Sequence, residues 1–156
     1  MTTIKILFTL LVLSCLSACK EKNPVDCWSS LDSIKSNRMS GNLELAFNQM
    51  SELSICLDSS KSEKGMRFYY HLGWLQHDSG DYKKAIESYN KGLEFQSDYA
   101  FAFWRRGLAY EQLGDVEQSI ADYKNAVQIG KATLPNFSEV LDDYPDVKLN
   151  LGPYVQ

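Results

Sequence analysis

The chain has 156 residues, of which 44% are hydrophobic and 23% charged, so it can form one globular domain with a modest core. Its formal net charge of -4 and the lack of any basic run argue against a sequence-independent nucleic-acid binder. We therefore expect no nucleic-acid partner.

The first 18 residues predict an export signal. One basic residue, Lys5, precedes an apolar run over residues 6–13, which is shorter than the ~20 residues that a membrane-spanning helix needs. The sequence Leu16-Ser17-Ala18-Cys19 follows and resembles the lipobox of bacterial lipoproteins, in which an aliphatic and two small residues precede a cysteine. The resemblance implies cleavage before Cys19 and acylation of Cys19, palmitate included. An ordinary signal peptide with an incidental cysteine is the alternative.

Residues 19–26 are polar, contain Pro24 and are expected to form a lipidated tether. The seven residues after Cys19 reach at most ~25 Å when fully extended, so the domain would lie close to its membrane. Lys20 follows the acylated cysteine. In Gram-negative lipoproteins an aspartate there favours the inner membrane, so the resemblance implies the outer membrane, facing the periplasm, if the source is Gram-negative.

Residues 27–65 are predicted to form a helical hairpin. A Gly41-Asn42 turn precedes an apolar helix face at Leu43, Phe47, Met50, Leu53 and Leu57, and residues 61–65 are interpreted as an insertion. Cys15 leaves with the signal, so Cys27 and Cys56 remain at neighbouring ends of the hairpin. In an exported protein they predict a disulfide worth ~3 kcal/mol. Two buried reduced thiols are the alternative.

Residues 66–99 and 100–133 repeat each other with a 34-residue period. Apolar residues spaced by four, three and four mark one face of the second helix in each unit, beginning at Tyr82 and Val116. We expect Gly80 and Gly114 to end the first helices with positive φ, and Asp81 and Asp115 to cap the second ones. Gln118 predicts a capping box with Asp115.

The two units resemble tetratricopeptide repeats. The family's aromatic, small, Gly-Asp and aromatic positions are filled by Tyr69, Gly73, Gly80-Asp81, Ala85, Tyr89 and Gly92, and then by Phe103, Gly107, Gly114-Asp115, Ser119, Tyr123 and Ala126. Gly73 and Gly107 are expected where two helices approach closely. Arg106 stands where the family usually has leucine, and the family's proline near the repeat end is missing.

The resemblance implies an all-α solenoid of about three helical hairpins, in which residues 27–65 are a degenerate first repeat. Residues 134–156 are expected to be a C-terminal cap and tail. Pro135 would begin a short capping helix bearing Phe137, Val140, Leu141 and Tyr144, and Pro145 would end it. The tail after Pro145 carries no clear signal.

A concave groove lined by the first helix of each repeat is the binding surface that the resemblance implies. The candidate residues are Arg67, Tyr70, Trp74, His77, Phe101, Trp104, Leu108 and Glu111, and the first unit adds Trp28, Leu31, Lys35, Arg38 and Met39. Tryptophan is enriched at binding hot spots. The alternative is that Trp74 and Trp104 are core residues. Arg67 and Arg105 are candidates for receiving carboxylates, although the family's dicarboxylate clamp is not reproduced.

No catalytic motif is recognised. His71 and His77 are six residues apart, which does not suit a metal pair on one helix face, so we expect no enzyme activity, metal or cofactor. The sequence favours a membrane-anchored envelope lipoprotein that binds a protein or peptide ligand as a scaffold. An immunity or inhibitor lipoprotein that neutralises a toxin or envelope enzyme is the alternative. The sequence leaves the oligomeric state open.

Overall fold

A computed structural model describes residues 24–55, 62–134, 136–143 and 145–155, with the backbone alone at residues 24–28, 62 and 140. The predicted signal segment 1–18, the predicted lipidation site Cys19, and Cys56 lie outside the described residues. The predicted Cys27–Cys56 disulfide lies outside them too, because only the backbone of Cys27 is described.

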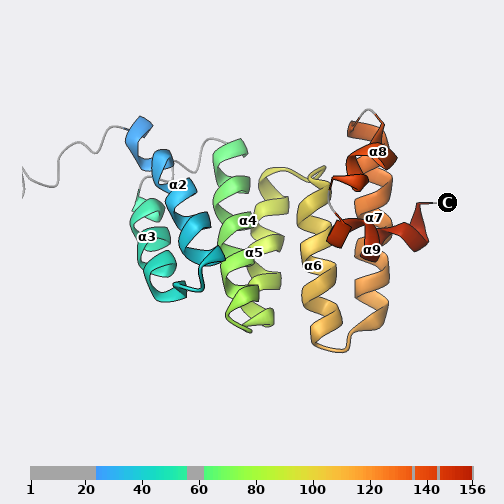
Figure 1. Cartoon of the computed structure of the whole chain (residues 1–156), viewed down its shortest axis with the longest axis horizontal. Helices are drawn as coiled ribbons and strands as arrows, with labels where there is room; N and C mark the ends of the chain where they lie inside the picture. Colours follow the sequence, from blue (N-terminus) through green and yellow to red (C-terminus); the bar gives the residue numbers. More distant parts are fainter. Residues whose placement is uncertain (1–23, 56–61, 135, 144, 156) are drawn as a thin grey trace, which may run out of the picture.

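The described residues form helices and no strand. Three antiparallel pairs stand side by side in chain order, followed by short C-terminal helices (Figure 1). The elements are α2 (Pro24–Met39), α3 (Leu43–Ile55), α4 (Ser62–Asp78), α5 (Tyr82–Phe95), α6 (Ala100–Gln112), α7 (Val116–Thr133), α8 (Phe137–Asp142), α9 (Pro145–Leu151) and the 3-10 turn η1 (Gly152–Tyr154). The predicted all-α solenoid of helical hairpins is confirmed.

All three pairs are joined by the same turn. Gly41, Gly80 and Gly114 have φ values of 79°, 82° and 77°, and each ends a helix. In the third turn the N–H of Gly114 donates to the carbonyl of Glu111, and that of Asp115 donates to Tyr110. This bond pattern is the Schellman motif, and equivalent bonds occur in the other two turns.

The turn also explains why the predicted capping box is only half right. The Asp115 side chain accepts from the N–H of Gln118, as an N-cap does, and Asp81 does the same with Lys84. The backbone N–H of Asp115 already donates to Tyr110 at 2.9 Å. It is therefore not free to receive the Gln118 side chain that would complete the box.

Glycine lets the two helices of a pair approach closely. A Cβ built on Gly73 would lie 2.7 Å from the ring of Tyr89, and one on Gly107 would lie 2.7 Å from the ring of Tyr123. Both rings are buried, at 0% and 5% exposure. The close approach predicted at these two glycines is confirmed.

Four element boundaries differ from the prediction, and one of them is the start of α8, which lies at Phe137 and not at Pro135. Helix α2 begins at Pro24, inside the predicted tether. Helix α4 begins at Ser62, so residues 62–65 are its first turn and not an insertion, with Gly65 packed against the ring of Phe95. Pro145, predicted only to end the capping helix, occupies the first position of α9, where its missing N–H costs nothing.

Buried side chains form three consecutive clusters along the array. The first joins α2 and α3 to α4, the second joins α4, α5 and α6, and the third joins α6 and α7 to the C-terminal helices. In the third, Trp104 packs with Tyr123, Phe137 and Leu151. Each hairpin thus shares its core only with its neighbours.

Arg106, the residue in the usual leucine position, forms a largely buried ion pair. Its Nε and Nη2 atoms donate to Asp122 at 2.8 and 2.7 Å, and its Nη1 donates to the Asn90 side chain at 2.5 Å. Asp122 is 3% exposed. The guanidinium therefore links α5, α6 and α7 through hydrogen bonds where a leucine would only pack.

Candidate partner-binding groove

An open groove of about 1070 Å³ runs along the first helices of the three hairpins, α2, α4 and α6. Four residues around the start of α9 add to its lining at the third hairpin: Asp143, Pro145, Asp146 and Val147. The lining residues are Lys35, Arg38 and Met39, then Glu63, Met66, Arg67, Tyr70, His71 and Trp74, then Gln96, Tyr99, Phe101, Trp104 and Arg105, and finally Asp143, Pro145, Asp146 and Val147.

Trp74 lies between two arginines in the middle of the groove. The Cζ atoms of Arg38 and Arg105 are 3.7 and 3.9 Å from the centroid of its ring. Two guanidinium groups so close to one centroid cannot share a face, so they cover opposite faces of the indole. Each such contact contributes ~0.5–2 kcal/mol, depending on how far it is shielded from water.

The two arginines differ in their hydrogen bonds. Arg38 Nη1 lies 2.5 Å from Asp78 Oδ2, so its charge is neutralised within the chain. Burial raises the pKa of Asp78, but hydrogen bonds from His77 and Arg38 outweigh burial and leave the pKa below its usual value. The Nε of each arginine is buried without a partner, but for Arg105 no hydrogen bond or ion pair with another described residue is found.

His71 contributes no positive charge to the groove at neutral pH. Its side chain is 9% exposed and lies parallel to the Trp74 ring, with the centroids 6.3 Å apart. Burial lowers the pKa of His71 to about 3; the charges of Lys35, Arg67 and Arg38 add to this shift and that of Asp32 opposes it. The basic character of the groove therefore comes from lysine and arginine.

Five of the eight residues proposed for the groove in the two clear repeats line it: Arg67, Tyr70, Trp74, Phe101 and Trp104. Lys35, Arg38 and Met39 of the first unit line it as well, whereas Leu31 is buried in the core. For Trp28 the structure describes the backbone alone.

Three proposed residues lie outside the groove because each has a contact elsewhere. His77 lies against Asp78 and the ring of Tyr82. Leu108 packs on the C-terminal cluster, and the carboxylate of Glu111 accepts a hydrogen bond of 2.6 Å from the Tyr123 hydroxyl. These three are therefore not placed to contact a ligand bound along the described lining.

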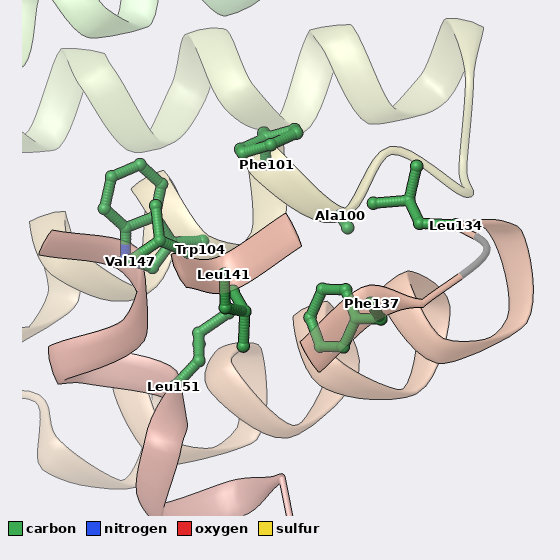
Figure 2. Close-up of a pocket in the computed structure, with 8 residues that line it drawn as sticks. All are labelled: Ala100, Phe101, Trp104, Leu134, Phe137, Leu141, Val147 and Leu151. Atoms are coloured by element: carbon green, nitrogen blue, oxygen red, sulfur yellow. The ribbon is translucent and has the colours of Figure 1, made fainter. Parts of the chain in front are cut away.

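Trp74 and Trp104, which the sequence left open as groove or core residues, differ in their surroundings. Trp104 is 5% exposed, and its Nε1 donates to the Asn150 side chain at 3.4 Å. Figure 2 shows Trp104 among Phe137, Leu141, Val147 and Leu151, around a cleft of only about 10 Å³. That volume is about the minimum for one water, so this seam is core packing. Trp104 is mainly a core residue, whereas Trp74 is a groove residue.

Sequence reasoning missed the lining contributed by Asp143 and by the first residues of α9, because they lie far from α4 in the chain and carry no repeat pattern. It also missed the stacking of Arg38 and Arg105 on Trp74, which depends on how three hairpins are placed relative to one another. Local spacing carries no signal for such a contact. The types of the residues, arginine and tryptophan, were the only available hint.

The described residues contain neither a cluster of metal-ligating side chains nor a membrane-spanning helix. No three His, Cys, Asp or Glu side chains there are grouped as metal ligands would be. Likewise, none of the helices in that part of the chain combines the length and apolarity needed to cross a membrane.

Comparison with known proteins supports the repeat architecture. Residues 73–114 match the family model described as TPR repeat, and residues 102–130 match that described as Tetratricopeptide repeat. The Photosystem I assembly protein Ycf3 of Prochlorococcus marinus (strain NATL2A) is 30% identical over 89 residues, which are 54% of this chain and 51% of that protein. The match thus spans about half the length of that relative.

Solved structures of similar shape are also helical solenoids. The type III secretion translocator chaperone SycD of Yersinia enterocolitica has a TM-score of 0.66 at 22% identity, covering 82% of this chain and 89% of that one. MamA has a TM-score of 0.58 at 19% identity, covering 91% and 79%. At such identities the likeness concerns the fold alone. The chain is therefore an all-helical solenoid of tetratricopeptide-type hairpins, and family models detect such repeats within residues 73–130.

Proposed function

We propose that this chain is a lipid-anchored scaffold of the cell envelope that binds a segment of a partner protein in the concave groove. A solenoid of this kind offers an extended concave surface for holding another molecule. Among the similar proteins, one is named a translocator chaperone and another an assembly protein, which favours a role in handling other proteins.

The observation that carries the proposal is the position of Trp74. It is partly exposed in a groove of about 1070 Å³ that spans three hairpins, and two guanidinium groups hold its ring in place. A rigid aromatic side chain at the centre of a concave surface is a typical binding hot spot, and truncating one costs about 2 kcal/mol or more. The groove is large enough for a peptide or one face of a helix.

The test uses a photo-crosslinking residue placed at Arg67, which is exposed in the groove, and as a control at Glu117, which is exposed at the start of α7 and outside the lining. We expect a specific crosslinked partner from position 67 in living cells and none from position 117. Trp74→Ala should reduce that crosslink at least tenfold with helical circular dichroism unchanged. Trp104 is left intact because it is buried in the core.

The matched control for Trp74→Ala is Leu113→Ala, which removes an exposed apolar side chain outside the groove and should leave the crosslink unchanged. Equal crosslinking from positions 67 and 117, or an unchanged yield with Trp74→Ala, would exclude the groove as the binding surface.

The anchor is tested separately. The lipobox resemblance supports acylation of Cys19, and several acyl chains together make attachment to a membrane stable. We expect Cys19→Ala to move the protein from the membrane fraction to the soluble fraction. Retention of the variant in the membrane fraction would contradict the lipid assignment while leaving the groove proposal standing.

A further inference from the structure

The groove gathers cationic side chains on a chain that is acidic overall. The chain has a net charge of -4, yet four cationic side chains, Lys35, Arg38, Arg67 and Arg105, line the groove. The acidic residues of the lining are Glu63, Asp143 and Asp146. Lys35 is paired with Asp32 and Arg38 with Asp78, so the charge available for a ligand lies on Arg67 and Arg105.

Of these two, Arg105 is the more constrained. Its Cζ lies 3.9 Å from the centroid of Trp74 and 4.2 Å from that of Trp104, so the guanidinium is held against two indoles. Its Nε is buried and has no hydrogen-bond partner, and a buried donor without a partner destabilises the fold. No described residue accepts a hydrogen bond from the guanidinium of Arg105, although this side chain lines the groove.

The chemistry of a stacked guanidinium indicates which ligand group can accept its remaining hydrogen bonds. Aromatic contacts cover its faces, and the N–H groups in its plane remain as donors. A carboxylate matches that edge, because it can accept two parallel N–H bonds from arginine. Neutral acceptors lack both the charge and the second oxygen.

We propose that Arg105 is the subsite for a side-chain carboxylate of the bound segment, so that the partner segment carries Asp or Glu flanked by apolar residues. This inference rests on the proposed function. A side chain fits better than a chain terminus because the lining continues beyond Arg105, to Lys35 and Arg38 on α2 and to Phe101 and Val147. A segment that ended at Arg105 would leave one part of the groove uncovered.

The test selects random 12-residue peptides displayed on phage against the full chain in a non-ionic detergent. The peptides are fused through their carboxyl ends, so only side chains present carboxylates. We expect the enriched peptides to contain Asp or Glu between apolar residues. Synthetic amidated copies should bind at least tenfold more weakly after Glu→Gln or Asp→Asn.

Arg105→Met and Arg67→Met are the paired protein variants. Methionine keeps an apolar stem on the indoles but removes the guanidinium, so Arg105→Met should reduce the tenfold discrimination to less than twofold. Arg67→Met removes the exposed groove arginine and should preserve the discrimination. A cooperative unfolding transition above the assay temperature verifies that both variants are folded.

Each of the other outcomes contradicts either the Arg105 subsite or the proposed function. Peptides that bind the wild type equally with Glu and Gln, or whose discrimination disappears with Arg67→Met instead, overturn the Arg105 subsite but not the scaffold. A free carboxyl-terminal form that binds tenfold more tightly than the amide, with no effect of Glu→Gln, also overturns it. Failure to enrich any peptide over the Trp74→Ala protein overturns the proposed function itself.

Discussion

At the scale of single residues, Arg106 shows how a departure from a family pattern is compensated. Burial disfavours the charge of its guanidinium, but hydrogen bonds and attraction from Asp122 outweigh burial, so the pKa of Arg106 is raised. The pair is worth less than its geometry suggests, because both charges lose water on folding. Removing only one partner of the pair is nevertheless destabilising, because the charge of the other partner would then be buried without an opposite charge.

Arg106→Leu restores the residue usual for the family and is nevertheless expected to destabilise the fold by about 3–5 kcal/mol, because it leaves the carboxylate of Asp122 buried without its partner. The measurement is urea unfolding followed by circular dichroism. Arg106→Leu combined with Asp122→Leu should recover most of the loss. Wild-type stability of the single variant would show that the ion pair is not needed.

At the scale of elements, contact between the two helices of the second and third pairs depends on a glycine. The Tyr123 ring packs on Gly107 from α7, while its hydroxyl donates to Glu111 of α6. The hydrogen bond fixes the ring, so the ring cannot retreat from an added methyl group. The packing of α6 on α7 therefore depends on Tyr123, whose ring contacts Gly107 and whose hydroxyl is hydrogen bonded to Glu111.

Gly107→Ala gains about 1 kcal/mol of helix propensity and loses about 1–3 kcal/mol to overpacking, so we expect a net loss of roughly 1 kcal/mol. Thermal unfolding should show this as a lower midpoint. Gly152→Ala is the control, because an added Cβ there meets nothing within 4 Å and φ is not positive. Equal midpoints for the two variants would mean that the α6–α7 contact adapts freely.

The paired helices were predictable because each carries its own signal. The repeated glycines and aspartates mark the turns, and apolar residues spaced by four and three mark the buried faces. Helix α9 was not predictable, because its seven residues are too few to be stable alone and depend on burying Val147 and Leu151. The start of α4 was missed for a similar reason, since packing of Gly65 on Phe95 overrides the low helix propensity of glycine.

The candidate site was predictable only in part. The repeat pattern located Trp74 and Tyr70, since each position of a repeat faces a known direction. It misplaced Leu108 and Glu111, because the C-terminal cluster and the Tyr123 hydroxyl engage them instead. Such engagement depends on residues far away in the chain, and no local spacing encodes it.

At the scale of the whole molecule, stability is distributed along a line. The three buried clusters follow one another, and the first joins α2 and α3 only to α4. In such an array, stability is approximately a sum of the stabilities of the repeats and of the interfaces between neighbours. A destabilising substitution at one end of the array should therefore lower the local stability of that end only.

Met50 is 1% exposed in the first cluster, so Met50→Ala is expected to cost about 2–5 kcal/mol locally. Hydrogen exchange measured by mass spectrometry should become faster in α2 and α3 and stay unchanged in α6 and α7. A uniform increase in every helix would instead show that the solenoid unfolds as one cooperative unit.

The different surroundings of the two described indoles have an optical consequence. Trp74 is partly exposed between two cations, whereas Trp104 is buried and hydrogen bonded to Asn150. The emission of Trp74 therefore reports whether solvent or a ligand fills the groove, and that of Trp104 reports whether the C-terminal helices remain docked. With Trp28 replaced by phenylalanine, intrinsic fluorescence separates occupancy from unfolding without any added dye.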